Sequence, residues 1–243
     1  MITCRTYVHG PVVFGITTRE SGGDFRRPER MEDRASSREA WERLRMTHDA
    51  DAAIRRRQVH GCVCEQVDGM SPTEVGVADA LFTTSTGVLI AVTVADCCGV
   101  VLWSRTSPLV ACIHSGWRGT RDGIVNTSID RIRTDTDTPA GALHAWLSPC
   151  ASGRSYLVRG DVREVFPDYC RQVGEDQFLF DNRAAIRDQL VRAGIPPENV
   201  TASDTCTMED PLYHSYRRDG ENSGRNAVFA LLRHPDVTSA TGG

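Results

Sequence analysis

Lysine is absent from this chain of 243 residues, so all 28 of its basic residues are arginines. The absence excludes Schiff-base chemistry and a lysine clamp on phosphate, because both need an ε-amine. Arginine can still bind phosphate or carboxylate through two parallel hydrogen bonds. Anion recognition in this protein must therefore depend on arginine.

Long apolar runs are also missing from the chain. None approaches the roughly 20 residues that a membrane-spanning helix needs, and the opening segment MITCRTYVHG lacks the apolar core of a secretory signal. We therefore expect a cytoplasmic protein with no membrane partner. The net charge of −4 gives no basic surplus, so we expect no nucleic-acid partner either.

The nine cysteines are an odd number in a chain of ordinary size. Without a secretion signal, such a set indicates free thiols and a metal site more than a disulfide framework. We expect most of them to lie in the core, where a thiol behaves as a small apolar group.

Two apolar runs form the centre of the chain, at 88–94 and 109–113. Both are rich in Val and Ile and end at turn residues, which predicts buried strands. The first run leads to Asp96 and Cys97, and the second leads to His114. Because strands are rigid, a thiol and an imidazole at neighbouring strand ends can be held in a fixed geometry.

Other patterns predict the remaining elements. Strands are expected at 12–17, 53–67, 79–83, 143–147, 200–203 and 226–233, a polar loop at 21–35, and helices at 36–46, 121–133, 161–170 (broken by a proline) and 182–193. Strands and helices alternate without a linker, which predicts one α/β domain with a mixed sheet over residues 1–233. Residues 234–243 are expected to be a disordered tail.

His60, Cys97 and His114 are the first candidate site. Two imidazoles and a thiolate are a common zinc set, and three protein ligands leave a fourth position for water or substrate. The ligands stand 37 and 17 residues apart, which suits separate strand ends and excludes a zinc finger. A metal held there can activate water or bind an anionic oxygen. Cys62 and Cys64 are a rival thiol pair beside His60.

The same residues allow a site without a metal. Cys97 can act as a nucleophile with His114 as its base, and Asp96 can orient the base or a water molecule. A purely structural role for the histidines, with their nitrogens satisfied in a core or loop, is the third possibility. The residues alone leave these three open.

A glycine-bracketed turn at 116–119 precedes the expected helix at 121. Amides at a helix N-terminus bind anions, and Arg118 adds a guanidinium, so phosphate binding is one interpretation. A tight turn with a solvated arginine is the other. Further arginines that can bind phosphate are Arg19, Arg217 and Arg218, and tyrosines that can stack on an aromatic ligand are Tyr156, Tyr213 and Tyr216.

Eight blocks occur in a fixed order along the chain. They are QVHG (58–61), ADALFT (78–83), ADC (95–97), HSGWRGT (114–120), SPCASGRSYLV (148–158), DNRAAIRDQL (181–190), CT (206–207) and SYRRDGENSGR (215–225). Together they resemble the YfiH / multicopper polyphenol oxidoreductase-like (laccase domain-containing) family of zinc-dependent purine nucleoside phosphorylases. The resemblance extends from about residue 19 to about residue 232.

This resemblance implies a fold, a metal and a reaction. The fold would be the single-domain mixed-sheet sandwich shared with the cytotoxic-necrotizing-factor catalytic domain. His60, Cys97 and His114 fall on the family's metal positions, with zinc expected and copper less so. The reaction would be phosphorolysis of adenosine, inosine, guanosine and methylthioadenosine, with adenosine deamination as a side activity. The expected ligands are therefore a nucleoside and phosphate, the latter bound by Arg19 and Arg118.

Two alternatives remain beside this assignment. One is a cysteine hydrolase or amidase that uses Cys97 and His114, either in editing peptidoglycan precursors, to which some bacterial members are linked, or in a specialised biosynthetic pathway. The other is a protein that binds a metal or nucleoside without turnover. Residues 20–40 lack the family's usual serine-leucine-asparagine block, which is expected to line the substrate pocket in relatives. That departure is compatible with a specialised substrate.

Overall fold

The computed structural model of the chain describes residues 3–21, 24–26 and 34–235. Its strands are β1 Cys4–His9, β2 Val12–Thr17, β3 Ala52–Ile54, β4 Cys64–Gln66, β5 Ala80–Thr83, β6 Val88–Val94, β7 Cys98–Ser104, β8 Val110–Ser115, β9 Leu143–Leu147, β10 Leu157–Val158, β11 Cys170–Gly174, β12 Gln177–Phe180, β13 Val200–Ala202 and β14 Asn226–Leu232. Its α-helices are α1 Arg34–Thr47, α2 Trp117–Asp122, α3 Ile124–Thr136, α4 Gly160–Val165, α5 Asn182–Arg192 and α6 Tyr216–Asp219.

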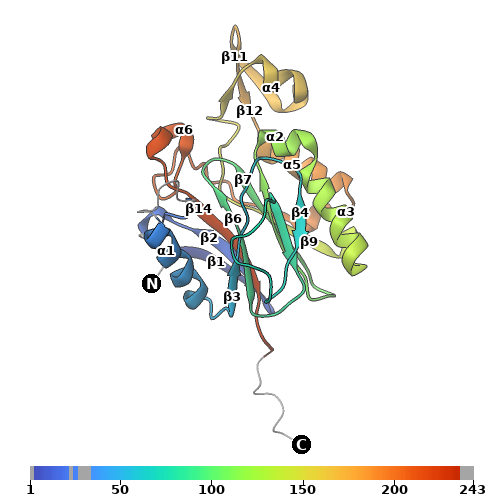
Figure 1. Cartoon of the computed structure of the whole chain (residues 1–243). Coiled ribbons are helices and arrows are strands. Elements are labelled where there is room, and N and C mark those ends of the chain that lie inside the picture. Colours follow the sequence, from blue (N-terminus) through green and yellow to red (C-terminus); the bar gives the residue numbers. More distant parts are fainter. Residues whose placement is uncertain (1–2, 22–23, 27–33, 236–243) are drawn as a thin grey trace, which may run out of the picture.

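Two mixed sheets form the body of the molecule. The five-stranded sheet has the order β1-β2-β14-β6-β3, and the six-stranded sheet has the order β13-β9-β7-β8-β5-β4. Most neighbours are antiparallel, but β3–β6, β4–β5 and β9–β13 pair in parallel. Figure 1 shows the sheets stacked with helices outside them. The mixed-sheet α/β sandwich is therefore confirmed.

Both faces of the central strands are buried, and side chains alternate between two cores. On β6, Leu89 packs in the cluster that includes α1, whereas Ile90 packs in the cluster between the sheets. On β7, Val101 lies between the sheets and Val100 lies in the cluster on the other face. A strand buried on both faces reads as a continuous apolar run rather than an alternating one. This explains the two central runs of the sequence.

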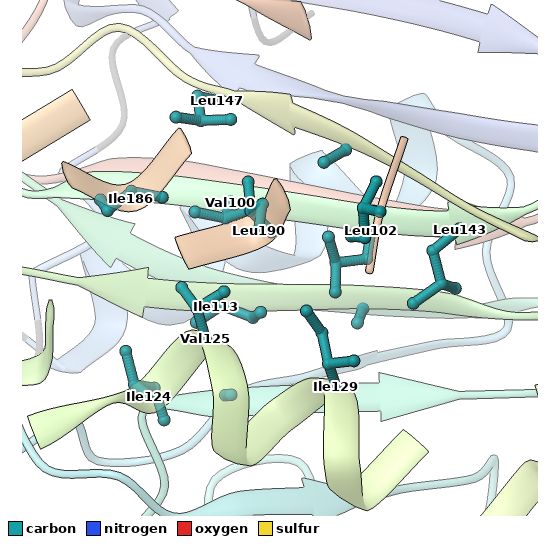
Figure 2. Packing of buried hydrophobic residues seen from close by; sticks show 14 of the residues in the cluster. Val100, Leu102, Ile113, Ile124, Val125, Ile129, Leu143, Leu147, Ile186 and Leu190 are labelled. Carbon is teal, nitrogen blue, oxygen red and sulfur yellow. The ribbon is translucent and has the colours of Figure 1, made fainter. Parts of the chain in front are cut away.

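Helices α3 and α5 cover the outer face of the six-stranded sheet. Figure 2 shows Ile129 of α3 and Ile186 of α5 in the same cluster as Val100 and Ile113 of the sheet. The period of 3.6 residues places the apolar side chains of α3 on one stripe. Fully burying such an aliphatic side chain stabilises the fold by about 1.5–3 kcal/mol.

A small three-stranded sheet, β10-β12-β11, lies with α4 at one end of the sandwich. It has its own core, which includes Phe166 and Phe180. Trp117 and Tyr156 pack against that core while only partly buried. The small sheet therefore supports two aromatic residues that also line the cavity described below.

Several sequence predictions need correction. The strand expected at 53–67 is wrong, because only the ends of this segment form strands, β3 and β4. The helix expected from residue 121 starts earlier, at Trp117, and Gly123 with φ 82° separates α2 from α3. Five strands were not predicted: β1, β7, β10, β11 and β12.

Parts of two predictions lie outside the described residues. Within the loop expected at 21–35, positions 22–23 and 27–33 are not described, and neither is 236–243 of the expected tail. The end of the domain at residue 233 stays a prediction. Among the helices that the structure describes, none has the length and apolarity needed to cross a membrane.

Candidate metal centre

The three candidate ligands come together at one end of the sandwich. His60 lies in the connection from β3 to β4, and Cys97 lies in the connection from β6 to β7; both connections pass from the five-stranded to the six-stranded sheet. His114 is on β8. One ligand atom from each residue lies within 4.8 Å of those of the other two. Among the described residues, this is the one group of three or more His, Cys, Asp or Glu side chains placed to hold a metal ion.

Asp79 fixes both histidines, although the sequence analysis assigned it no role. Its side chain is fully buried, and His114 Nδ1 lies 2.8 Å from its Oδ1. The same carboxylate accepts the backbone N–H groups of Val59, His60 and Gly61 at 2.9–3.1 Å. A histidine that donates through Nδ1 keeps the Nε2 lone pair for a metal, and an outer carboxylate of this kind is usual behind metal-bound histidines.

Two site residues have unusual backbone conformations. His60 has φ 60° and Asp96 has φ 86°, in the left-handed region that non-glycine residues seldom adopt. Such a conformation costs about 1–3 kcal/mol and persists where surrounding contacts enforce it. For His60 those contacts are the amide hydrogen bonds to Asp79. The strain therefore coincides with the ligand-bearing connections.

The thiol and the imidazole shift each other's protonation. Burial raises the pKa of Cys97, but the neighbouring His114 and His60 outweigh it and lower that pKa to about 6. Burial lowers the pKa of His114, but Cys97 and Asp79 raise it to about 9. The pKa of Asp79 is lowered: its burial opposes the shift, and the hydrogen bonds from His114, Val59 and Gly61 produce it. The shift favours the thiolate form of Cys97, which is the form that binds metals.

The chemistry of these donors fits zinc. Two imidazoles and one thiolate, with a carboxylate behind one imidazole, match the ligand types and outer partner of protein zinc sites. The space beside them is kept free by Gly116, where a Cβ would lie 2.8 Å from Cys97 Sγ and 3.2 Å from His60 Cδ2. The residues present therefore fit the metal that the sequence predicted.

The substitution Gly116→Ala is expected to weaken metal binding while leaving the fold intact. The φ of Gly116 is −75°, which alanine adopts freely, so the effect comes from the added methyl against Cys97 and His60. Zinc content measured by mass spectrometry should fall while circular dichroism stays unchanged. Gly123→Ala is the control for backbone strain. Gly123 has φ 82° and open space around it, so this variant should lower the stability of the fold but keep its zinc. Equal zinc content in wild type and Gly116→Ala would show that the site has room for the methyl group.

Helix α5 holds the turn that follows His114. Asn182 donates to the Ser115 carbonyl at 2.9 Å, and Gln189 donates to the Thr120 carbonyl at 2.8 Å. Both side chains come from one face of α5. Two side-chain hydrogen bonds from α5 therefore hold the turn that carries Gly116.

Asp96 lies beside Cys97 but is engaged by other groups. Its Oδ1 accepts the Thr207 hydroxyl at 2.7 Å, and its Oδ2 accepts the Arg217 backbone N–H at 2.6 Å. These bonds connect the β6–β7 connection with the start of α6. The geometry favours positioning over proton transfer for this carboxylate.

A cavity of about 690 Å³ lies over the metal ligands. Most of the predicted site residues line it, namely His60, Asp96, Cys97, His114, Arg118, Tyr156 and Arg217. The Arg118 guanidinium stacks on the Trp117 ring at 4.5 Å, and that of Arg217 stacks on the Tyr156 ring at 4.9 Å. A cavity of this size, with aromatic faces and a few charged groups, suits a small-molecule ligand.

Three predicted ligand-binding residues lie elsewhere. Arg19 is not among the lining residues, and its guanidinium pairs with Asp219 at 3.2 Å. Arg218 donates to the backbone carbonyls of Thr207 and Tyr213, and Tyr213 is itself fully buried in the core between the sheets. Cys62 and Cys64, the rival thiol pair, are also absent from the metal group.

Comparison with known proteins finds relatives over most of the chain. A family model described as "Multi-copper polyphenol oxidoreductase laccase" matches residues 27–233. A purine nucleoside phosphorylase of Xylella fastidiosa (strain 9a5c) is 32% identical over 190 residues, which covers 72% of this chain and 70% of that protein. The purine nucleoside phosphorylase YfiH of Escherichia coli (strain K12) is 33% identical over 182 residues, 72% of each chain.

Solved structures have the same fold. The crystal structure of YlmD from Geobacillus stearothermophilus matches with a TM-score of 0.84 and 26% identity, over 93% of each chain. The Bacillus licheniformis hypothetical protein YfiH matches with a TM-score of 0.82 and 22% identity, over 91% of this chain and 93% of the other.

Proposed function

This chain belongs to the multi-copper polyphenol oxidoreductase laccase family, and from that premise we propose that it is a zinc-dependent purine nucleoside phosphorylase. The observation that carries the proposal is the His60–Cys97–His114 cluster inside a cavity with stacked aromatic and arginine side chains. The names of relatives that are about 32% identical point to the same reaction. Adenosine, inosine, guanosine and methylthioadenosine are the proposed substrates.

The cavity residues have separate roles in this proposal. Arg118 and Arg217 bind the attacking phosphate, because guanidinium groups match phosphate oxygens. Tyr156 provides an aromatic face for the purine. Phosphorolysis breaks the C1′–N9 bond and forms a bond from C1′ to a phosphate oxygen, so its rate depends on holding both reactants in line.

His60, Cys97 and His114 would hold the zinc ion. A bound zinc supplies a Lewis acid or an activated water, and the latter would explain deamination of adenosine as a side activity. Asp79 keeps His114 in the ligating tautomer, and Asp96 orients Arg217. Oxidase chemistry with several copper ions has less support, because the described residues form one three-donor group that can hold a metal.

Removal of the metal is the direct test of this function. We expect zinc-loaded protein to release free base from inosine, adenosine and methylthioadenosine only when phosphate is present, with products followed by chromatography. Dialysis against a chelator should abolish turnover, and added zinc should restore it. Phosphate-independent conversion of adenosine to inosine would reveal the activated water. Unchanged phosphorolysis after complete zinc removal would contradict the proposal.

A second candidate function uses the same residues without a metal. In this interpretation the nucleophile is Cys97, its base is His114, and the carboxylate that orients the base is Asp79. Such a triad suits a hydrolase or amidase. Such an enzyme would keep its activity in chelator, whereas the phosphorylase would lose it. A binding protein without turnover would take up zinc and nucleoside but release no product in either condition.

A further inference from the structure

The cavity is strongly basic, although the chain as a whole carries a net charge of −4. Seven arginines line it, against three acidic residues. Three of the arginines have carboxylate partners: Arg26 pairs with Asp24, Arg55 with Glu74, and Arg56 with Glu65. In the part of the chain that the structure describes, the other four form no ion pair; they are Arg57, Arg118, Arg217 and Arg225.

Phosphorolysis accounts for two of these four arginines. Arg118 and Arg217 belong to the part of the cavity with Trp117 and Tyr156, and we assign them to the attacking phosphate. Arg57 and Arg225 line the same cavity as Phe25 and Trp41, and the chain connects each of them to this aromatic pair. Arg57 is two residues from Arg55, which stacks on Trp41 at 4.5 Å, and the Arg225 carbonyl accepts the N–H of Phe25, whose ring packs on Trp41.

Hydrogen bonds within the folded chain hold the backbone of Arg57 and the guanidinium of Arg225. Arg57 exchanges backbone hydrogen bonds with Gly76 and Ala78, and the side chain of the next residue, Gln58, is bonded to the backbone of Thr93 at 2.7 and 2.8 Å. The Arg225 guanidinium donates to the carbonyls of Ser223 and Gly224, both at 3.0 Å, and its Cζ lies 5.7 Å from the Tyr216 ring centre. The Arg225 guanidinium therefore loses little conformational entropy when it binds an anion.

Two guanidinium groups that line a cavity and have no carboxylate partner attract an anion. A neutral nucleoside carries no anionic group that could bind them. We therefore propose that the substrate of this chain is a purine nucleoside that carries a phosphate group, of the nucleoside 5′-monophosphate class, with Arg57 and Arg225 as its phosphate ligands. This inference rests on the proposed function. We place the phosphate at the 5′ position because a substituent there leaves both C1′ and the base free to react.

The reaction balances without an oxidant or reductant. Inorganic phosphate attacks C1′, the C1′–N9 bond breaks, and the purine leaves with its electron pair and takes up a proton at nitrogen. The products are the free base and ribose 1,5-bisphosphate. The 5′-phosphate itself is not transferred.

The test compares inosine 5′-monophosphate with inosine on zinc-loaded protein in excess phosphate. We expect kcat/KM to be at least ten times higher for the nucleotide. Arg57→Gln and Arg225→Gln should each reduce that preference by about tenfold or more, and Arg57→Lys should recover part of it. Calorimetric titration with the nucleotide, in the absence of phosphate, should show the same order of affinities.

Arg133→Gln is the matched control, because Arg133 lies exposed on α3 and pairs only with Asp130; it should keep the full preference. Equal or better turnover of inosine would overturn the inference and leave the phosphorylase function standing. If neither compound reacts, but calorimetry shows tight nucleotide binding that Arg57→Gln loses, the phosphorylase function fails and the anion site stands. Nucleotide affinity unaffected by either substitution would overturn the site.

Discussion

The Cys97→Ser variant is expected to fold normally, to lose its zinc and to have no measurable phosphorolysis. A serine hydroxyl stays protonated at neutral pH, so the site would lose the one anionic ligand among His60, Cys97 and His114. The affinity for zinc should fall by more than the roughly 10–100-fold typical of losing an outer hydrogen-bond partner. Zinc content, zinc titration and turnover measure the three consequences.

Cys62→Ser is the matched control for this experiment. Cys62 lies two residues from His60, is partly exposed, and does not belong to the metal group. It should retain zinc and activity, and its thermal unfolding should still shift upward when zinc is added. If Cys62→Ser loses zinc and Cys97→Ser keeps it, the rival thiol pair is the true site.

The Asp79→Asn variant is expected to lose both stability and metal affinity. The carboxylate accepts hydrogen bonds from three backbone amides and lies against His114 Nδ1, all without solvent. An asparagine keeps one acceptor oxygen and directs an NH₂ group at the same donors. Breaking a buried charged network of this kind typically lowers the free energy of unfolding by about 3–5 kcal/mol.

Urea unfolding of the zinc-free protein measures the stability part, and zinc titration of the folded protein measures the affinity part. The zinc affinity should fall roughly 10–100-fold, because His114 loses its fixed tautomer. Asp122→Asn is the control, since Asp122 is exposed and pairs with Arg121 on the surface; its effect should stay below about 0.5 kcal/mol. An unfolding free energy equal to that of the wild type would show that the loop at 59–61 does not depend on Asp79.

Strands β6 and β8 could be predicted from the sequence because burial on both faces produces a continuous apolar run. Strand β7 was missed, although it is just as fully buried. The strand expected at 53–67 shows the limit of that reasoning. Val59 and Val63 resemble a strand pattern, yet their side chains are 48% and 52% exposed. The segment is held by the carboxylate of Asp79, twenty positions away from Val59. No local pattern contains that contact.

The sequence also predicted part of the candidate site and missed another part. The three residues that the resemblance assigns to a metal lie in one cluster, and Arg118, Tyr156 and Arg217 line the cavity. Asp79 was missed, although its place beside an expected strand and the need of a metal-bound histidine for a carboxylate could have suggested it. Arg19 and Tyr213 lie outside the cavity lining, because an ion pair holds the first and a core position the second, and both depend on the three-dimensional packing.

The passage of the chain between sheets has a consequence for the order of folding. His60 and Cys97 both lie where the chain leaves the five-stranded sheet for the six-stranded one. The ligands can therefore meet only after the two layers have docked. A partly folded chain with one sheet formed has no site to load, so metal uptake reports the completed sandwich. A metal ion bound at that point would also tie the layers together, and unfolding would then have to begin at the end of the sandwich farthest from the metal or wait for the metal to leave.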